Sequence, residues 1–418
     1  MTEVEPSSAM RDIIAEVMDI EDFVLGPSQA TLRARGELTV PSEEAFDLLE
    51  SRLAELDHTP IMYREADGDH ILAVESEVMA PTRALPWLSG ILLLFTLVRV
   101  IQLGVQQDAP GPLAGPLDYF RNITAALTFS GVVLGVLLAR EVARFLVARR
   151  HRLEISLPYF IPLPGLTSIF LAPFIFLGER AAFFALGIAT RSVMPWGTLG
   201  GIVAQRTPAR DRRTVFDMAV AATLAGFLVS LIALVAGLLQ SEVMTIDFSQ
   251  AFLLEGQSLG YRLVKLAIFG QWLPGGGDDV FISTLAMAGW TGLLLTMLHL
   301  MPYGSLDGGH IVYGLAGQRG IAWGRRTVVV ALVLLSLVDV SAYGLGLLPV
   351  RITGYLGWLL WLAIIVLFRR DNAQVLDEIT PLGTGRRIVG ILMLVLLVLL
   401  FTPVPFLAWQ ALRPGPVV

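Results

Sequence analysis

The sequence predicts a mainly α-helical protein that crosses a membrane about seven or eight times and carries a small α/β domain at its N-terminus. Its composition is the first reason. Of the 418 residues, 55% are hydrophobic and 16% are charged, and the mean hydropathy is +0.68, which is too apolar for an ordinary soluble protein. The second reason is that several apolar runs reach the roughly 20 residues that a helix needs to cross a bilayer. The first of them follows a polar, acidic stretch.

Residues 1–84 are expected to form a separate soluble domain with a linker to the membrane part. A secretory signal is not expected, because the first residues are polar and acidic rather than basic and then apolar. Ser42 is expected to be a helix N-cap, and His58 and His70 are expected at the surface. Alternation and turn residues predict strands at 29–38, 59–65 and 70–77 and a helix at 42–56.

Residues 85–409 are expected to form the membrane-embedded domain, followed by a tail at 410–418. A proline-broken region at 157–204 is expected to contain a re-entrant segment, because irregular backbone at membrane depth must be covered by protein or water. Residues 249–273 are expected to lie along the membrane surface. Spans are predicted at 85–106, 122–148, 215–239, 282–303, 327–348, 354–368 and 388–409.

The basic residues predict the orientation in the membrane. Arginines cluster after the second span, before the third, before the fifth and between the last two, whereas the intervening loops hold few. By the positive-inside rule, the arginine-rich loops and the N-terminal domain are cytoplasmic. Lys265 is the only lysine, a bias that indicates a GC-rich bacterial genome. The expected location is therefore a bacterial inner membrane.

Composition also excludes some partners and chemistries. The chain has no basic domain, so nucleic acid is not an expected partner. It has no cysteine, so neither a disulfide framework nor a thiolate ligand or nucleophile is expected. The lipid bilayer is the first expected partner.

The second span contains the first candidate site, Arg140-Glu141-Val142-Ala143-Arg144. Ionisable residues inside a span are costly and usually functional. Residues four positions apart share one helix face, so Arg140 and Arg144 point the same way and Glu141 lies beside them. This is the spacing of HExxH, in which two histidines bind zinc and the glutamate is a general base. Here arginine occupies both ligand positions.

A second candidate site follows a later span, where His299 precedes the run Leu306-Asp307-Gly308-Gly309-His310. An aspartate in a glycine-rich break beside a membrane helix can supply a carboxylate ligand. The alternative is a turn between helices that needs only glycine flexibility and a capping aspartate. Spacing alone does not separate the two interpretations.

Further runs occur along the chain at 157–162, 197–201, 288–293, 380–382 and 402–405. With the two candidate sites, they resemble the membrane-embedded site-2 protease family of zinc metallopeptidases, in particular its bacterial and plastid branch with a cytosolic N-terminal domain. The likeness covers most of 85–409, apart from an apparent insertion near 165–195. It implies a helical membrane domain of the site-2 protease type and intramembrane proteolysis of transmembrane proteins.

The resemblance also implies a site. In the family, two histidines and an aspartate hold zinc, and a glutamate activates water. Carried over by position, the ligands are Arg140, Arg144 and Asp307, and the base is Glu141, so only the two carboxylates match. The other departures are Ala222-Thr223 in place of Gly-Pro, His299 in place of Asn, and a missing His-Pro pair near 371–372.

Arginine cannot replace histidine as a zinc ligand, because its guanidinium keeps a pKa above ~12 and offers no lone pair. We therefore expect no cofactor, or zinc only if the family's activity is retained. Two guanidinium groups would restore the charge of the ion and bridge Glu141 and Asp307 in an ion-pair clasp. One alternative is that the arginines reach the lipid headgroups. Another is a rearranged metal site formed by Glu141, Asp307, His299 and His310.

The expected function is that of a pseudoprotease, which binds transmembrane proteins without cleaving them. The first alternative is an active zinc metalloendopeptidase that uses altered ligands. A transporter is a third possibility, but the sequence has no visible inverted repeat. Substrates or clients are expected to add a strand to a hairpin formed by Gly197, Thr198, Leu199, Gly200 and Gly201.

Overall fold

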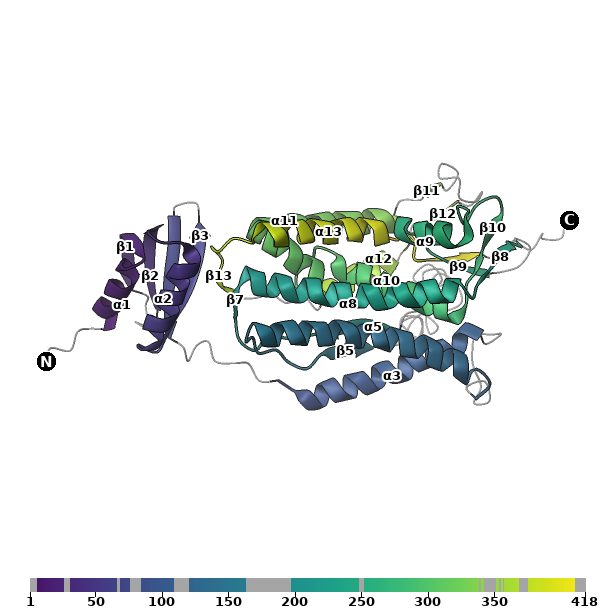
Figure 1. Ribbon diagram of the computed structural model, residues 1–418, viewed down its shortest axis with the longest axis horizontal. Coiled ribbons are helices and arrows are strands. Elements are labelled where there is room, and N and C mark those ends of the chain that lie inside the picture. The colour runs from purple at the N-terminus through teal and green to yellow at the C-terminus, as the bar shows by residue number, and fades with distance from the viewer. Residues whose placement is uncertain are drawn as a thin grey trace, which may run out of the picture.

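A computed structural model gives the fold as two parts, a small mixed domain and a bundle of long helices (Figure 1). The structure describes residues 6–25, 31–65, 68–75, 84–108, 120–162, 197–247, 252–337, 340–341, 351–352, 355, 357–367 and 375–409. The tail and the insertion near 165–195 lie outside these residues.

The N-terminal part is an antiparallel sheet with two helices packed on it. The strands β1 to β4 pair in the order β1-β2-β4-β3. The predicted helix and strands all occur, with ends shifted by up to two residues. The elements are α1 (Pro6–Ala15), β1 (Met18–Leu25), β2 (Thr31–Leu38), α2 (Ser42–Ala54), β3 (His58–Glu65) and β4 (Gly68–Glu75).

Two predictions for this part are wrong. The N-cap of α2 is Pro41, and Ser42 lies inside the first turn, where its hydroxyl bonds to Thr380 instead of a helix N–H. His70 is fully buried, not on the surface, because it stacks on Tyr63 and its Nδ1 accepts hydrogen bonds from Arg33. Helix α1 and strand β1, which complete the hydrophobic core, are not predicted from the sequence.

The remaining helices lie side by side (Figure 1). Within the described residues, four are long and apolar enough to cross a membrane: α3, α5, α8 and α11, with α10 and α12 as shorter apolar helices. These helices indicate an integral membrane protein. The predicted number of seven or eight spans is not confirmed. The helices are α3 (Pro86–Asp108), α5 (Ile123–Arg150), α8 (Arg212–Leu238), α9 (Leu259–Phe269), α10 (Thr284–Leu300), α11 (Asp307–Leu337), α12 (Gly357–Leu367) and α13 (Thr384–Leu400).

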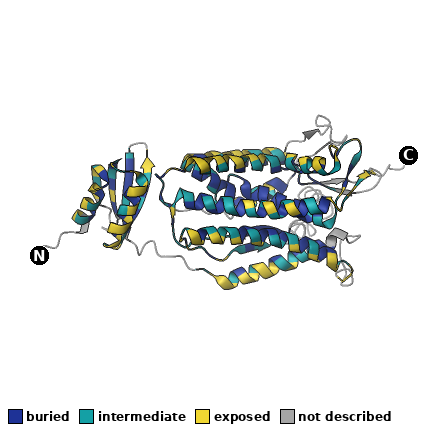
Figure 2. Cartoon of the chain, in the orientation of Figure 1, coloured by how far each residue is buried: buried dark blue, intermediate teal, exposed yellow. Residues whose placement is uncertain are grey.

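Two predicted spans have other boundaries. The span predicted at 327–348 belongs to α11, which begins at Asp307 and is interrupted by non-helical backbone at Gly317. The span predicted at 388–409 ends at Leu400, and a strand follows, β14 (Phe406–Trp409), which pairs with β9 (Phe252–Glu255). Large apolar side chains such as Ile232 and Val398 are exposed, as expected for contact with lipid. Figure 2 shows exposed positions along several of the helices.

Short strands lie between the helices. β5 (Tyr159–Pro162) and β6 (Thr198–Ile202) form an antiparallel hairpin beside α3 and α5. β8 (Glu242–Thr245) pairs with β10 (Asp278–Phe281), and β11 (Val340–Ser341) pairs with β12 (Arg351–Ile352). β13 (Val375–Asp377) and β7 (Ala209–Asp211) extend the N-terminal sheet beyond β3, so the two parts of the protein share one six-stranded sheet.

Candidate functional site

The arginine motif lies in the middle of the bundle. Helix α5 runs from Ile123 to Arg150, and its last turns carry Arg140, Glu141 and Arg144. Arg140 is 1% exposed and Glu141 is also buried. The Arg144 side chain is only slightly more exposed, at 11%. The arginines therefore do not extend to the lipid headgroups, and the snorkelling alternative does not fit their burial.

Asp307 reaches the same place from another helix. It is the first residue of α11, directly after the turn that follows α10. This turn needs its glycines, because a Cβ at Gly308 would lie 1.8 Å from the carbonyl oxygen of Leu300, and one at Gly309 would lie 2.2 Å from that of Gly304. The tight turn brings the start of α11 against the end of α10 and buries the Asp307 carboxylate.

The four charged side chains are joined in a chain by three hydrogen bonds. Asp307 Oδ2 accepts from Arg140 Nη2 at 2.5 Å, and Oδ1 accepts from Arg144 Nη2 at 2.7 Å. Arg144 Nη1 donates to Glu141 Oε2 at 2.6 Å. Arg144 therefore bridges the two carboxylates, and both oxygens of Asp307 are occupied by arginine. We call Arg140, Glu141, Arg144 and Asp307 the clasp.

Glycines in neighbouring elements make room for the clasp. A Cβ at Gly226 of α8 would lie 2.6 Å from Arg140 Cγ, so any larger residue there would displace the arginine. On the other side, a Cβ at Gly201 of β6 would lie 3.2 Å from Glu141 Oε1. The predicted hairpin thus lies directly against the clasp, and its residues 197–201 are all buried.

His299 lies beside the clasp but faces the hairpin. Its Nδ1 lies 2.9 Å from the Leu295 carbonyl oxygen and donates to it. Its ring is so close to Gly200 that a Cβ there would be 2.7 Å from Nε2. His310 is half-buried, one turn after Asp307. Both histidines are therefore near the clasp, but Asp307 already accepts from two arginines.

The remaining departures from the family pattern are only partly visible. Ala222 and Thr223 are fully buried in α8, one turn before Gly226. The Thr223 hydroxyl and Arg140 Nη1 are both buried without a hydrogen-bond partner among the described residues. Residues 371–372 lie outside the described residues.

The clasp residues do not fit a zinc ion. The clasp contains two carboxylates and two permanently protonated groups, and a protonated guanidinium has no electron pair to donate. Within the described part of the chain, no group of three or more His, Asp or Glu side chains is arranged to hold a metal. The rearranged site of Glu141, Asp307, His299 and His310 is therefore not assembled in this conformation.

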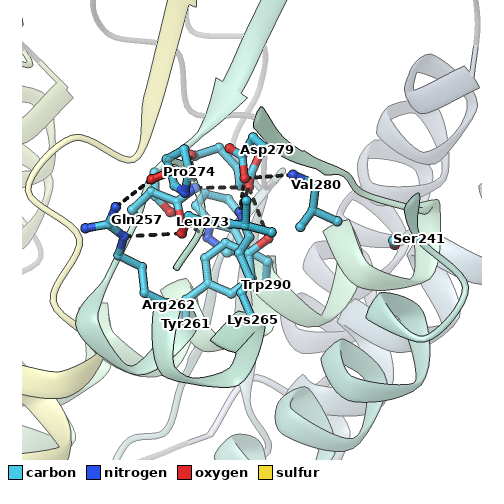
Figure 3. Close-up of polar contacts among 12 residues, drawn as sticks. Ser241, Gln257, Tyr261, Arg262, Lys265, Leu273, Pro274, Asp279, Val280 and Trp290 are labelled. Atoms are coloured by element: carbon cyan, nitrogen blue, oxygen red, sulfur yellow. Dashed lines mark hydrogen bonds and ion pairs between the residues drawn. The ribbon is translucent and has the colours of Figure 1, made fainter. Parts of the chain in front are cut away.

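A second buried group of charges is not predicted from the sequence. Lys265 of α9 is fully buried, and its Nζ donates to Glu255 Oε1 at 3.0 Å and to Asp279 Oδ1 at 2.8 Å (Figure 3). The Tyr261 hydroxyl also donates to Glu255 Oε1, at 3.0 Å. We call Glu255, Tyr261, Lys265 and Asp279 the lysine cluster. Its elements β9, α9 and β10 lie at the end of the bundle away from the N-terminal domain (Figure 1).

The lysine cluster has one cation for two carboxylates. Burial, and then the neighbouring Glu255 carboxylate, raise the pKa of Asp279, although Lys265 opposes the shift. Burial likewise raises the pKa of Tyr261 well above 10.0. The only sequence signal for this cluster was the single lysine, and nothing in the sequence indicated its partners 10 and 14 residues away.

Comparisons with known proteins find relatives named as chloroplast zinc metalloproteases. The chain is 26% identical to "Probable zinc metalloprotease EGY1, chloroplastic" of Oryza sativa subsp. japonica, over 88% of this chain and 62% of the relative. It is 26% identical to the Arabidopsis thaliana protein of the same name, over 79% and 56%. For "Probable zinc metalloprotease EGY3, chloroplastic" of Oryza sativa subsp. indica, the identity is 24% over 88% and 59%.

The chain thus spans little more than half the length of these curated relatives. No family model matches the chain, and no solved structure matches it.

Proposed function

This chain belongs to the site-2 protease family, in its plastid type, and from that premise we propose that it is a pseudoprotease, which binds membrane-protein clients without cleaving them. The observation that supports this proposal most is the hydrogen bonding of the Asp307 carboxylate. Both of its oxygens accept from arginines at the positions where the family has zinc-binding histidines. Two guanidinium groups bonded to this carboxylate already neutralise its charge, and they would repel a metal cation at the same place.

Without zinc, the hydrolytic step has no Lewis acid and no metal-bound water of low pKa. Glu141, at the position of the general base, is buried and hydrogen-bonded to Arg144. The clasp instead supplies a fixed link between α5 and α11. Such a link stabilises the fold around the client groove, while the reaction is lost.

The client groove is proposed to run along β6. Two of its five residues are glycines, and Gly200 lies against His299 while Gly201 lies against Glu141. Main-chain groups can approach most closely where side chains are absent, which favours the addition of an extended client segment to this hairpin. The clients we propose are transmembrane proteins whose spans unwind locally beside the clasp.

The test compares the natural chain with the double variant Arg140→His/Arg144→His. Purified protein is reconstituted with a single-span reporter peptide, and both binding and cleavage are measured. The natural chain should bind the reporter without cleaving it. The double variant should gain zinc and, if the rest of the site is intact, some cleavage. Gly201→Val is the matched variant for the groove, and it should weaken binding. Cleavage by the natural chain that stops when a chelator is added would refute the proposal.

A second candidate function is an active zinc metalloendopeptidase. It is favoured by the relatives, which are named as probable zinc metalloproteases, and by the retention of both carboxylates. Zinc binding would require the arginines to leave Asp307 and His299 or His310 to turn toward it. Substitution of both His299 and His310 by Gln would abolish cleavage under this alternative, whereas under the main proposal the natural chain shows no cleavage to lose.

We also propose an orientation for the protein in its membrane. The distribution of arginines supports placing the N-terminal domain, residues 1–84, on the cytoplasmic side or on the side that corresponds to it in an organelle. The relatives are chloroplast proteins by name, which does not fit the bacterial inner membrane indicated by the arginine bias. A protease-protection assay on membranes with a tag at the N-terminus would determine the side.

A further inference from the structure

The six-stranded sheet joins two parts of the chain that have separate cores. The N-terminal domain buries its own apolar cluster, which includes Ile14, Phe46 and Met62. The strands β13 and β7, by contrast, precede α13 and α8 of the membrane part, and they lie beside β3 at the boundary (Figure 1). A domain with its own core and a small contact to its neighbour is free to detach as a unit.

Strand β13 is the centre of this contact. Asp377 lies opposite Met62 of β3 on one side and Asp211 of β7 on the other. Leu376 packs against the core of the N-terminal domain, whereas Val375 belongs to an apolar cluster of the membrane part. Since successive side chains of a strand point to opposite faces, this short strand contributes to both cores at once.

Arg210 provides the first charged contact across the boundary. Its guanidinium bonds to Asp47 and lies 3.5 Å from Glu50, both in α2. The same guanidinium lies 5.2 Å from the centre of the Phe46 ring. All three partners come from one face of α2, so this single arginine holds the helix by charge and by stacking.

Arg213 and a pair of hydroxyls provide the second contact. Arg213 Nη1 donates to Glu43 at 3.0 Å, and its Nε donates to the Pro381 carbonyl at 3.1 Å. The Ser42 and Thr380 hydroxyl oxygens are 2.9 Å apart. The acidic start of α2 therefore lies against the loops that lead into α8 and α13.

The contact also reaches the helix that carries Asp307. Glu378, next to β13, accepts from the Tyr313 hydroxyl at 2.7 Å and from Gln318 at 3.0 Å. Both donors are in α11, which begins at Asp307. The main-chain N–H of Glu378 in turn donates to Met62 of β3 at 2.8 Å. One residue thus connects the N-terminal sheet to the helix of the clasp.

We propose that the N-terminal domain is a detachable module, and that its acidic helix α2 and the edge of β3 form a docking surface for two segments of the chain itself, the arginine-bearing segment 209–213 and the extended segment 375–382. Docking fixes the N-terminal ends of α8, α11 and α13, which lie next to the N-terminal domain, and undocking frees these ends. The surface recognises a segment by extended main chain and by guanidinium groups together. It concerns the conformation of this chain and stands whether or not the clasp supports cleavage.

The electrostatic part of the docking can be measured separately from the apolar part. Exposed ion pairs each contribute little, so two must be reversed together to give a clear effect. Salt weakens them because the screening length falls from about 10 Å at ~0.1 M to about 3 Å at ~1 M. The contacts of Leu376 with the N-terminal core do not weaken in this way.

The chain has no cysteine, so the double variant Ser42→Cys/Thr380→Cys carries a single reporter pair across the dock. In the full-length protein in detergent, mild oxidation should cross-link this pair. The rate should fall about threefold or more in ~1 M salt and in the added double reversal Arg210→Glu/Arg213→Glu. Reversing the partners as well, with Asp47→Arg and Glu43→Arg, should restore it.

The matched control is the reversal Arg150→Glu/Arg319→Glu, since both arginines are exposed and lie outside the dock. It should leave the cross-linking rate unchanged, and that result would show that net charge alone does not alter the rate. A cross-linking rate that neither salt nor the dock reversal changes would mean a rigid junction and would overturn the proposal. So would a pair that never cross-links although both cysteines react with a maleimide.

Discussion

The clasp and the lysine cluster are both buried groups of charges, but they are balanced differently. In the clasp, two guanidinium groups face two carboxylates across two long helices. In the lysine cluster, one ammonium group lies between two carboxylates contributed by short strands. A planar guanidinium can bond to two carboxylates in fixed directions, whereas an ammonium is a compact charge with three adaptable donors.

The difference shows what each cluster requires. The clasp is neutral as long as all four groups are charged, and its arginines cannot give up their protons. The lysine cluster carries one surplus negative charge, which a proton on Asp279 can neutralise. Removing one charge should therefore be costly in the clasp, while the lysine cluster should respond to pH.

The largest expected effect is that of Asp307→Asn. This change keeps the size of the side chain but leaves two buried guanidinium groups facing one carboxylate. Removing one partner from a buried ion pair destabilises a protein by about 3–5 kcal/mol. The thermal unfolding temperature in detergent should fall by many degrees. The exposed Glu242→Gln is the control, and an unfolding temperature as high as that of the natural chain would show that the clasp does not stabilise the bundle.

A smaller effect is expected for Lys265→Met. The methionine fills a similar space, and either carboxylate can take up a proton in place of the lost ammonium. The loss should be about 1–3 kcal/mol at neutral pH, the cost of unsatisfied buried polar groups, and it should shrink as the pH falls. The same unfolding assay at two pH values tests this. A loss of stability that grows on acidification would contradict the assignment of a surplus negative charge to the lysine cluster.

The smallest effect is the pH dependence of the natural chain through Asp279. Its pKa is raised in the folded state, so the folded protein holds a proton that the unfolded chain releases near the ordinary value of 3.8. The stability from this group is complete below that value and is lost as the pH rises to the raised pKa. Asp279→Asn should flatten this part of the stability profile. An unchanged profile in the variant would assign the dependence to other groups.

The sequence could predict the clasp because its spacing along α5 fixes which side chains share a face. Arg140, Arg144 and Glu141 lie where the helix period puts them. The partner Asp307 was indicated by its glycine turn and by the resemblance to a family. The lysine cluster offered no such regularity, because Glu255, Lys265 and Asp279 lie on three different short elements whose pairing depends on tertiary contacts.

The same reason explains the errors in the soluble part. Serine is a preferred N-cap residue, but the Ser42 hydroxyl bonds to Thr380, far along the chain. His70 lies near the start of a strand that follows a polar turn sequence, yet β2 and Tyr63 cover it. In both cases a segment distant in the sequence determines the environment of the residue, and local propensity carries no information about that segment.

The most direct test of the account is the zinc content of the purified natural chain, measured beside the Asp307→Asn variant. Because arginine occupies both ligand positions, we expect far less than one zinc per chain, with no difference between the two proteins. One zinc per natural chain that disappears in Asp307→Asn would contradict it, because a metal would then be bound where the clasp places two guanidinium groups.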